Sequence, residues 1–217
     1  MINFLECALD LLFPPICGFC GKTNDMYICN DCKRIVKELA VNKIIKFNNK
    51  SFKKVLYIFK YDDIIREKIL EYKFGNKSYL YRTFAEAVLL NKSNIEFIKK
   101  YDFLIPVPIH KKRKLQRGFN QSELIARKIS QEIKDIKLDC KIIKKQKNIV
   151  PQSTLNRKER DKNIKGAYSI VNSKKIIGKN ILLLDDIFTT GSTLNECSKL
   201  IKMAGAKRVD AIVIAKD

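Results

Sequence analysis

One stretch constrains the fold of this chain more than any other: residues 181–193, which read ILLLDDIFTTGST. The apolar run is typical of a buried parallel strand, and in open α/β sheets ligands bind at the carboxyl ends of such strands. Two carboxylates, Asp185 and Asp186, follow the run, and a turn of small residues leads into a helical pattern. A helix N-terminus favours a phosphate. The stretch therefore predicts a site for a phosphorylated polyol.

Each part of this stretch taken alone could be structural, with the acids as solvated side chains and the turn as an ordinary N-cap. Together they resemble the phosphoribosyl pyrophosphate motif of type I phosphoribosyltransferases. That resemblance implies that Asp185 and Asp186 hold the ribose 2′ and 3′ hydroxyls and that the turn holds the 5′-phosphate. The turn consists of Thr189, Thr190, Gly191, Ser192 and Thr193.

At 217 residues the chain has room for one or two domains, and its hydrophobic content of 46% is that of a globular protein. No apolar run approaches the ~20 residues that a membrane-spanning helix needs. Residues 1–13 predict a short amphipathic helix rather than a signal peptide, because Glu6 and Asp10 interrupt the apolar positions. We therefore expect a cytoplasmic protein with no membrane span.

Four cysteines form two Cys-x-x-Cys pairs near the N-terminus: Cys17, Cys20, Cys29 and Cys32. Two such pairs can converge on one metal ion and close a tetrahedral four-thiolate zinc site. With all four ligands supplied by cysteine the zinc has no open position, so we predict a structural role in a segment too short for its own core. Two disulfides or a thiol redox motif are the alternatives.

The chain is strongly basic, with 44 lysines and arginines against 23 acidic residues and a formal net charge of +21. Such an excess favours a nucleic-acid or polyphosphate partner. A compositional bias toward lysine, isoleucine and asparagine would also raise the charge without selecting a partner. The basic residues are not confined to one run, so the sequence does not place a binding groove.

Strand and helix patterns alternate along the rest of the chain. Helices are expected at residues 31–40, 62–72, 77–90, 121–133 and 194–204, and strands near 55–60, 103–110, 138–143, 167–171, 181–184 and 209–215. This order predicts an α/β fold with a mostly parallel sheet flanked by helices. The resemblance to type I phosphoribosyltransferases implies the fold of that class, preceded here by the small zinc-binding segment. A polar linker at 41–50 places the domain boundary, which separates an N-terminal helix and zinc finger (1–45) from a phosphoribosyltransferase-like domain (46–217).

A second candidate ligand position follows the strand at residues 103–110, where five cations lie within residues 111–117. In phosphoribosyltransferases the loop after the equivalent strand receives the pyrophosphate, and a solvated charged face is the alternative. Lys73 either reaches the same diphosphate or caps its helix in solvent. The residues that we expect at the diphosphate are Lys73, Val107, Arg113 and Arg117.

Two further features leave alternatives open. His110, the only histidine, is either a proton carrier or a structural residue. Residues 146–165 are mostly polar, which is typical of a mobile loop that closes over a substrate or of a disordered segment. Neither feature selects one reaction.

Several motifs, in order along nearly the whole chain, are similar to those of the ComF family. They are the four-cysteine segment, Tyr72-Lys73-Phe74-Gly75, residues 106–108, residues 117–121, residues 152–163 and the acid motif. Members of this family are associated with competence for natural transformation, in which single-stranded DNA is handled in the cytoplasm beside a DNA-translocating helicase. The resemblance implies binding of phosphoribosyl pyrophosphate with Mg²⁺, of single-stranded DNA and of a competence helicase.

Binding of phosphoribosyl pyrophosphate does not establish transfer. The chain could instead be an active phosphoribosyltransferase, in which a nucleobase, a nucleotide or a nucleic acid displaces pyrophosphate from C1 of the ribose. A structural adaptor for a helicase, with a vestigial site, is a third interpretation.

Overall fold

The computed structural model describes residues 14–147 and 163–217 of the chain. The helix expected at residues 1–13 lies outside the described residues, and so does most of the polar stretch at 146–165. No helix in the described part is long and apolar enough to cross a membrane.

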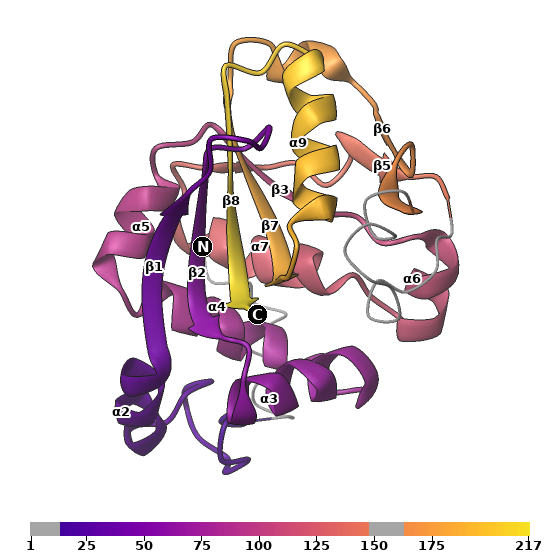
Figure 1. Cartoon of the computed structure of the whole chain (residues 1–217). Coiled ribbons are helices and arrows are strands. Elements are labelled where there is room, and N and C mark those ends of the chain that lie inside the picture. Colours follow the sequence, from indigo (N-terminus) through magenta and orange to yellow (C-terminus); the bar gives the residue numbers. More distant parts are fainter. Residues whose placement is uncertain (1–13, 148–162) are drawn as a thin grey trace.

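A six-stranded sheet forms the centre of the molecule, in the order β1-β2-β8-β7-β3-β4 (Figure 1). Its strands are β1 (Ala40–Lys46), β2 (Lys54–Lys60), β3 (Phe103–Pro106), β4 (Lys137–Leu138), β7 (Asn180–Phe188) and β8 (Arg208–Lys216). All neighbouring strands are parallel except β1, which pairs with β2 in the antiparallel direction. The expected mostly parallel sheet is confirmed.

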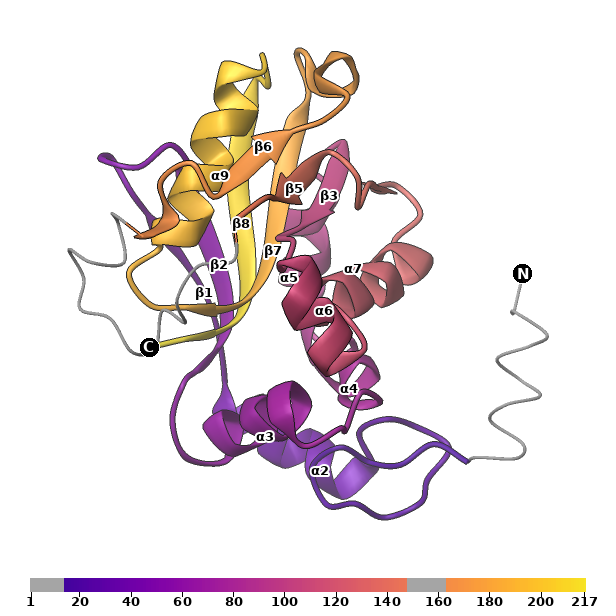
Figure 2. The same cartoon turned by 90° about the vertical axis from the view of Figure 1, so that its right-hand side faces the viewer.

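Helices cover both faces of this sheet. They are α2 (Asn30–Leu39), α3 (Asp63–Phe74), α4 (Leu80–Leu89), α5 (Lys92–Ile98), α6 (Lys111–Arg117), α7 (Gln121–Glu132), α9 (Ser192–Met203) and the 3₁₀ helix η2 (Ser173–Ile176). Figure 2 shows α9 on one side of the sheet and α4 and α7 on the other. The five expected helices are confirmed, the third of them beginning at Leu80, and α5 and α6 are additional.

The position of β7 in the centre of the sheet explains why its sequence is a continuous apolar run. Leu182 and Leu184 join a buried cluster with residues of α4 and α7, whereas Ile181 and Leu183 join a second cluster with residues of α9. All four side chains are fully buried. A strand buried on both faces has no polar positions to alternate with, as is usual for parallel sheets covered by helices.

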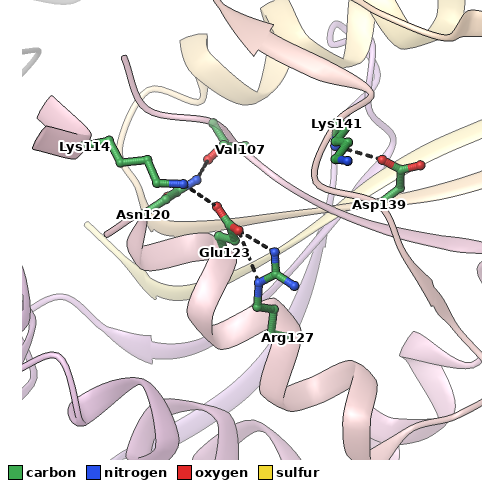
Figure 3. A network of polar contacts seen from close by, with 7 residues as sticks. All are labelled: Val107, Lys114, Asn120, Glu123, Arg127, Asp139 and Lys141. Carbon is green, nitrogen blue, oxygen red and sulfur yellow. Dashed lines mark hydrogen bonds and ion pairs between the residues drawn. The ribbon is translucent and has the colours of Figure 1, made fainter. Parts of the chain in front are cut away.

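A second, two-stranded antiparallel sheet packs in the cluster on the α9 side of the main sheet. Its strands are β5 (Ile143–Lys145) and β6 (Tyr168–Ile170). The prediction of one strand over residues 138–143 is therefore wrong, because β4 and β5 belong to different sheets. Between them the Asp139 carboxylate accepts a hydrogen bond from the backbone N–H of Lys141 (2.8 Å, Figure 3). Such a turn competes with the strand ladder.

The polar linker expected at residues 41–50 is also wrong over most of its length, because β1 follows α2 directly. The side chains of β1 are exposed or half-buried, as expected for an edge strand, and its register with β2 is irregular between Ala40 and Lys43. Exposure on this edge is the reason that the sequence reads as a linker. The proposed boundary between residues 45 and 46 falls inside β1, and the division into 1–45 and 46–217 stays a prediction.

Candidate functional site

Asp185 and Asp186 lie near the carboxyl end of β7, which continues through both acids to Phe188. Pairing with β8 along this length holds the backbone of the acid pair in a sheet rather than in a loop. One carboxylate oxygen of Asp185 accepts hydrogen bonds from the hydroxyl of Ser122 (3.3 Å) and from the backbone N–H of Asp186 (3.0 Å). The acids are therefore fixed in position by the central sheet and by the start of α7.

Lys73, in the last turn of α3, forms an ion pair with Asp186, with 2.8 Å between Nζ and Oδ2. Both side chains are largely buried, with 16% and 18% of their surfaces exposed. Lys73 is therefore not a solvated helix cap. The preceding residue, Tyr72, anchors this end of α3 because its buried hydroxyl donates a hydrogen bond to the carbonyl oxygen of Gln121 (2.9 Å).

Burial raises the pKa of Asp185 to about 7, and the negative charge of Asp186 acts in the same direction. The hydrogen bond from the backbone of Asp186 and the charges of Lys73 and Lys145 oppose this rise without cancelling it. A ligand that brings hydroxyl donors or a cation to the pair would stabilise its charged form.

The turn between β7 and α9 borders a pocket. The pocket is lined by Asp185, Ile187, Phe188, Thr189, Gly191, Ser192, Thr193 and Leu194. Gly191 has a φ of 72°, and an added Cβ would lie 2.7 Å from the ring of Phe188, so this position requires glycine. The hydroxyls of Thr190 and Ser192 are 2.6 Å apart. Because α9 begins at Ser192, its N-terminus opens onto the pocket, which suits an anion.

An aromatic cluster supports this turn from the connection between β1 and β2. The rings of Phe47, Phe52 and Phe188 lie with centroids 5.2, 5.5 and 6.2 Å apart. The backbone N–H of Ser51 also donates a hydrogen bond to Oδ1 of Asn195 in α9 (2.8 Å). Segments about 140 residues apart in sequence thus hold the turn in place.

The five cations of α6 divide into two groups. Arg113 and Arg117 are half-buried, whereas Lys111, Lys112 and Lys114 are exposed. Arg117 donates a hydrogen bond to Oε1 of Gln121 (3.2 Å). Burial lowers the pKa of Arg117, the charge of Asp186 raises it and that of Arg113 lowers it, so all three charges share one electrostatic environment. Helix α6 therefore carries both an exposed group of lysines and a half-buried pair of arginines in the electrostatic environment of Asp186.

Val107 and His110 follow β3 and shape the start of α6. The carbonyl oxygen of Val107 accepts a hydrogen bond from Nδ2 of Asn120 (3.1 Å, Figure 3), and its N–H donates to the carbonyl oxygen of Leu184 (2.9 Å). Nδ1 of His110 accepts a hydrogen bond from the N–H of Lys112 (3.2 Å) and so caps α6. This cap favours the structural interpretation of His110 over the proton carrier.

Sequence reasoning missed Lys145, at the end of β5. Its ammonium lies 5.1 Å from the centre of the Tyr168 ring. Burial lowers the pKa of Lys145 to about 8, and repulsion by Arg113 adds to this, while the charge of Asp185 opposes it. The small sheet thus directs a cation toward the acid pair from the α9 side. No motif singles out this residue, because it is one of several lysines in a short basic segment.

The four cysteines predicted to bind zinc converge in space. Their sulfur atoms all lie within 4.8 Å of one another, and those of Cys20 and Cys29 are 3.8 Å apart. Four sulfurs placed ~2.3 Å from a zinc ion at the corners of a tetrahedron would be about 3.8 Å apart. The sulfur of Cys17 also accepts a hydrogen bond from the backbone N–H of Cys29 (3.4 Å). None of the cysteines in the described part forms a disulfide, so the cluster fits a metal ion better than two disulfides.

The four-cysteine segment shares the core of the main domain. Cys17 and Cys32 belong to the same buried cluster as Leu80 of α4. A Cβ added to Gly18 would clash with the side chains of Thr83 and Leu80, which shows how closely the segment approaches α4. Thr83 also donates a hydrogen bond to the carbonyl oxygen of residue 27 (3.2 Å). The segment is therefore packed into the domain rather than attached to its surface.

The fold is of the type I phosphoribosyltransferase kind, and the family model described as the phosphoribosyl transferase domain matches residues 120–217. Competence protein F of Haemophilus influenzae is 31% identical over 214 residues, which cover 97% of this chain and 88% of that protein. The chain therefore belongs to the ComF family.

Two other relatives agree with this assignment. Competence protein ComFC of Streptococcus pneumoniae is 29% identical over 92% of this chain and 80% of its own length. DNA utilization protein YhgH of Escherichia coli O6:H1 is 31% identical over 108 residues, which cover 50% of this chain and 46% of that protein. The similarity to competence protein F covers 97% of this chain and therefore includes the four-cysteine segment as well as the phosphoribosyltransferase-like part.

Proposed function

We propose that this chain is a DNA-uptake protein of the ComF type, which binds phosphoribosyl pyrophosphate with Mg²⁺ and contacts single-stranded DNA. The names of its relatives, which refer to competence and to DNA utilization, support the role in DNA uptake. Binding of phosphoribosyl pyrophosphate is supported by one observation: an acid pair, a glycine-containing turn at a helix N-terminus and cations from α3 and α6 converge at one edge of the sheet.

Each part of the proposed site takes one part of the ligand. Asp185 and Asp186 accept hydrogen bonds from the ribose hydroxyls, and the turn at residues 189–193 donates to the 5′-phosphate. The diphosphate lies toward Lys73, the backbone at Val107, and the two half-buried arginines Arg113 and Arg117. The carboxylates and hydroxyls of the site are the oxygen ligands that Mg²⁺ prefers, and the ion would neutralise part of the diphosphate charge.

The ion pair of Lys73 and Asp186 keeps both charges neutralised when no ligand is bound. A diphosphate competes for the ammonium of Lys73, while ribose hydroxyls compensate Asp186. Binding therefore exchanges one internal ion pair for contacts to two parts of the same ligand, which favours a ligand that carries both groups.

Calorimetric titration of phosphoribosyl pyrophosphate in the presence of Mg²⁺ tests this proposal. The wild type should bind, and the Asp185→Asn/Asp186→Asn double variant should lose at least a hundredfold in affinity. Glu132→Gln is the matched control, because it removes a carboxylate whose side chain is 49% exposed and pairs only along its own helix with Lys128. If the wild type does not bind, the proposal that phosphoribosyl pyrophosphate is the ligand is refuted, and an adaptor protein with a vestigial site is favoured.

Titration of a labelled single-stranded oligonucleotide from low to high salt tests the DNA contact. Affinity should fall linearly on a double logarithmic plot, since each phosphate contact releases counterions with a slope of about −0.7 per contact for single strands. If the protein binds no oligonucleotide at low salt, the DNA contact is wrong.

Transfer of the phosphoribosyl group is the second candidate function, and Lys145 favours it. The small sheet that carries this residue gives the site a second side, opposite α3, where an acceptor would lie next to the acid pair. Pyrophosphate release should be measured with nucleobases, nucleotides and oligonucleotides as acceptors. Release of pyrophosphate with one acceptor class would establish transfer. If no acceptor causes release although phosphoribosyl pyrophosphate binds, the chain has a binding role.

A further inference from the structure

The C-terminal end of α3 lies beside α6 (Figures 1 and 2), and the two segments together expose apolar and cationic side chains. Phe74 is 68% exposed and Leu115 is 85% exposed, which is unusual for large apolar side chains. No residue of α6 is buried. We call this surface the Phe74 platform, and it comprises Phe74, Lys111, Lys112, Arg113, Lys114, Leu115 and Arg117.

The ring of Phe74 is oriented by an arginine. The guanidinium of Arg117 lies 4.8 Å from the centre of the ring. Gln121 in turn accepts a hydrogen bond from Arg117 (3.2 Å), and this glutamine is only 1% exposed. The aromatic ring and its cation are therefore held together before any partner binds, which reduces the entropy lost on binding.

The sequence segment that carries the platform is rich in positive charge. No acidic residue occurs in sequence between Asp102 and Glu123, a stretch that includes all of α6. Glu123 contacts Lys114 (3.4 Å) but is shared with Arg127, which it contacts at 2.7 Å (Figure 3). Lys111 and Lys112 are exposed, so their charges can attract an anionic partner.

An exposed aromatic ring beside a row of cations matches one class of partner. Proteins that bind single-stranded nucleic acid stack bases on aromatic side chains and track the phosphates with lysine and arginine. Duplex DNA offers the phosphates but keeps its bases stacked inside. We propose that the Phe74 platform binds single-stranded DNA, with one base on the ring of Phe74 and the neighbouring phosphates on the cations of α6.

The platform borders the diphosphate side of the phosphoribosyl site. Phe74 follows Lys73, which pairs with Asp186, and Arg117 lies in the electrostatic environment of the same acid. A bound strand therefore passes the entrance of the site and shares α6 with the diphosphate. This inference rests on the proposed contact with single-stranded DNA, and it adds which surface of the protein contacts the DNA.

Fluorescence anisotropy with a labelled oligothymidine tests the platform. Phe74→Ala should weaken binding by about 5- to 100-fold, the range measured for loss of one base stack. Phe74→Tyr keeps the ring and should retain the wild-type affinity. Met203→Ala is the matched control, because its side chain is 74% exposed on α9, and it should bind as the wild type does. An abasic oligomer of the same length should bind wild type and Phe74→Ala equally.

The outcomes separate this inference from the proposed function. Equal affinity of wild type and Phe74→Ala for the oligothymidine overturns the platform, and so does equal binding of a duplex. Phosphoribosyl pyrophosphate titrated against Phe74→Ala should bind as it does to the wild type, because Gln121 still holds Arg117. If Phe74→Ala binds neither phosphoribosyl pyrophosphate nor the oligothymidine, Phe74 supports the structure of α3 instead of contacting a base, and the platform is overturned as well. If the wild type binds no oligonucleotide at low salt, the DNA contact itself is wrong.

Discussion

Replacing Asp185 by asparagine should weaken ligand binding and yet stabilise the free protein at pH 8. Burial and the charge of Asp186 raise the pKa of Asp185 from an ordinary 3.8 to about 7, so folding penalises the charged form. That difference corresponds to about 4 kcal/mol at 1.36 kcal/mol per pH unit. The attractions of Lys73 and Lys145 are already included in this difference, and burying the amide N–H groups of the asparagine offsets part of it, so we expect a net gain on the order of 1–2 kcal/mol.

The stability gained by Asp185→Asn should depend on pH. Because the folded-state pKa is raised, the native protein retains a proton that the unfolded chain releases between pH 4 and pH 7, and wild-type stability falls as the pH rises through this range. The difference between variant and wild type should therefore be small at pH 4.5 and complete at pH 8. An asparagine Oδ1 can still accept the hydrogen bonds from Ser122 and from the backbone of Asp186.

Urea denaturation at both pH values measures the effect, and a thermal scan at pH 8 should show a rise of about 2–8 °C for a chain of this size. Asp186→Asn is the matched comparison, since it breaks the ion pair with Lys73 (2.8 Å) and should give no gain at pH 8. A less stable Asp185→Asn variant at pH 8, or an equal difference at the two pH values, would refute the reasoning.

Three other predictions concern the turn of the site, a buried ion pair of β8 and the four-cysteine segment. Gly191→Ala should cost about 1–3 kcal/mol in urea denaturation and abolish binding of phosphoribosyl pyrophosphate, because its φ is 72° and the new Cβ meets Phe188; wild-type stability would contradict this. Asp210→Asn should cost roughly 3–5 kcal/mol by the same assay, since Asp210 is fully buried and pairs with Arg208 at 2.6 Å; a loss below 1 kcal/mol would show that the pair is not needed. Cys29→Ser should release the metal, measured by elemental analysis, and lower the melting temperature of the whole chain; an unchanged melting temperature would mean that the segment folds independently.

Local patterns in the sequence predicted the parts of this protein that depend on local chemistry. The spacing of the cysteines indicates a metal site without any knowledge of the fold, and Cys20 and Cys29 do lie 3.8 Å apart. The apolar run before Asp185 is buried on both faces because β7 is central in a covered sheet. The order of strands and helices then requires a mostly parallel sheet.

Contacts between distant segments were not visible in the sequence. Nothing near Lys145 or Ser122 indicates that either approaches Asp185, because their positions depend on how β5 and α7 pack against the sheet. The count of cations after β3 did not reveal which of them face the site, since this depends on the rotation of α6 about its axis. Edge strand β1 was read as a linker for a related reason: an exposed strand carries the polar composition of a loop.

With a metal ion held by the four cysteines, the core that this segment shares with α4 would make the amount of folded protein sensitive to the cell's supply of metal. A ligand that binds only the folded chain stabilises it by about 1.4 kcal/mol for each tenfold rise in its free concentration above the dissociation constant. Because Cys17 and Cys32 belong to the same buried cluster as Leu80, that free energy would also stabilise the part of the chain that carries the acid pair. A cell short of this metal would then lose part of the folded protein, and with it the proposed capacity to handle DNA.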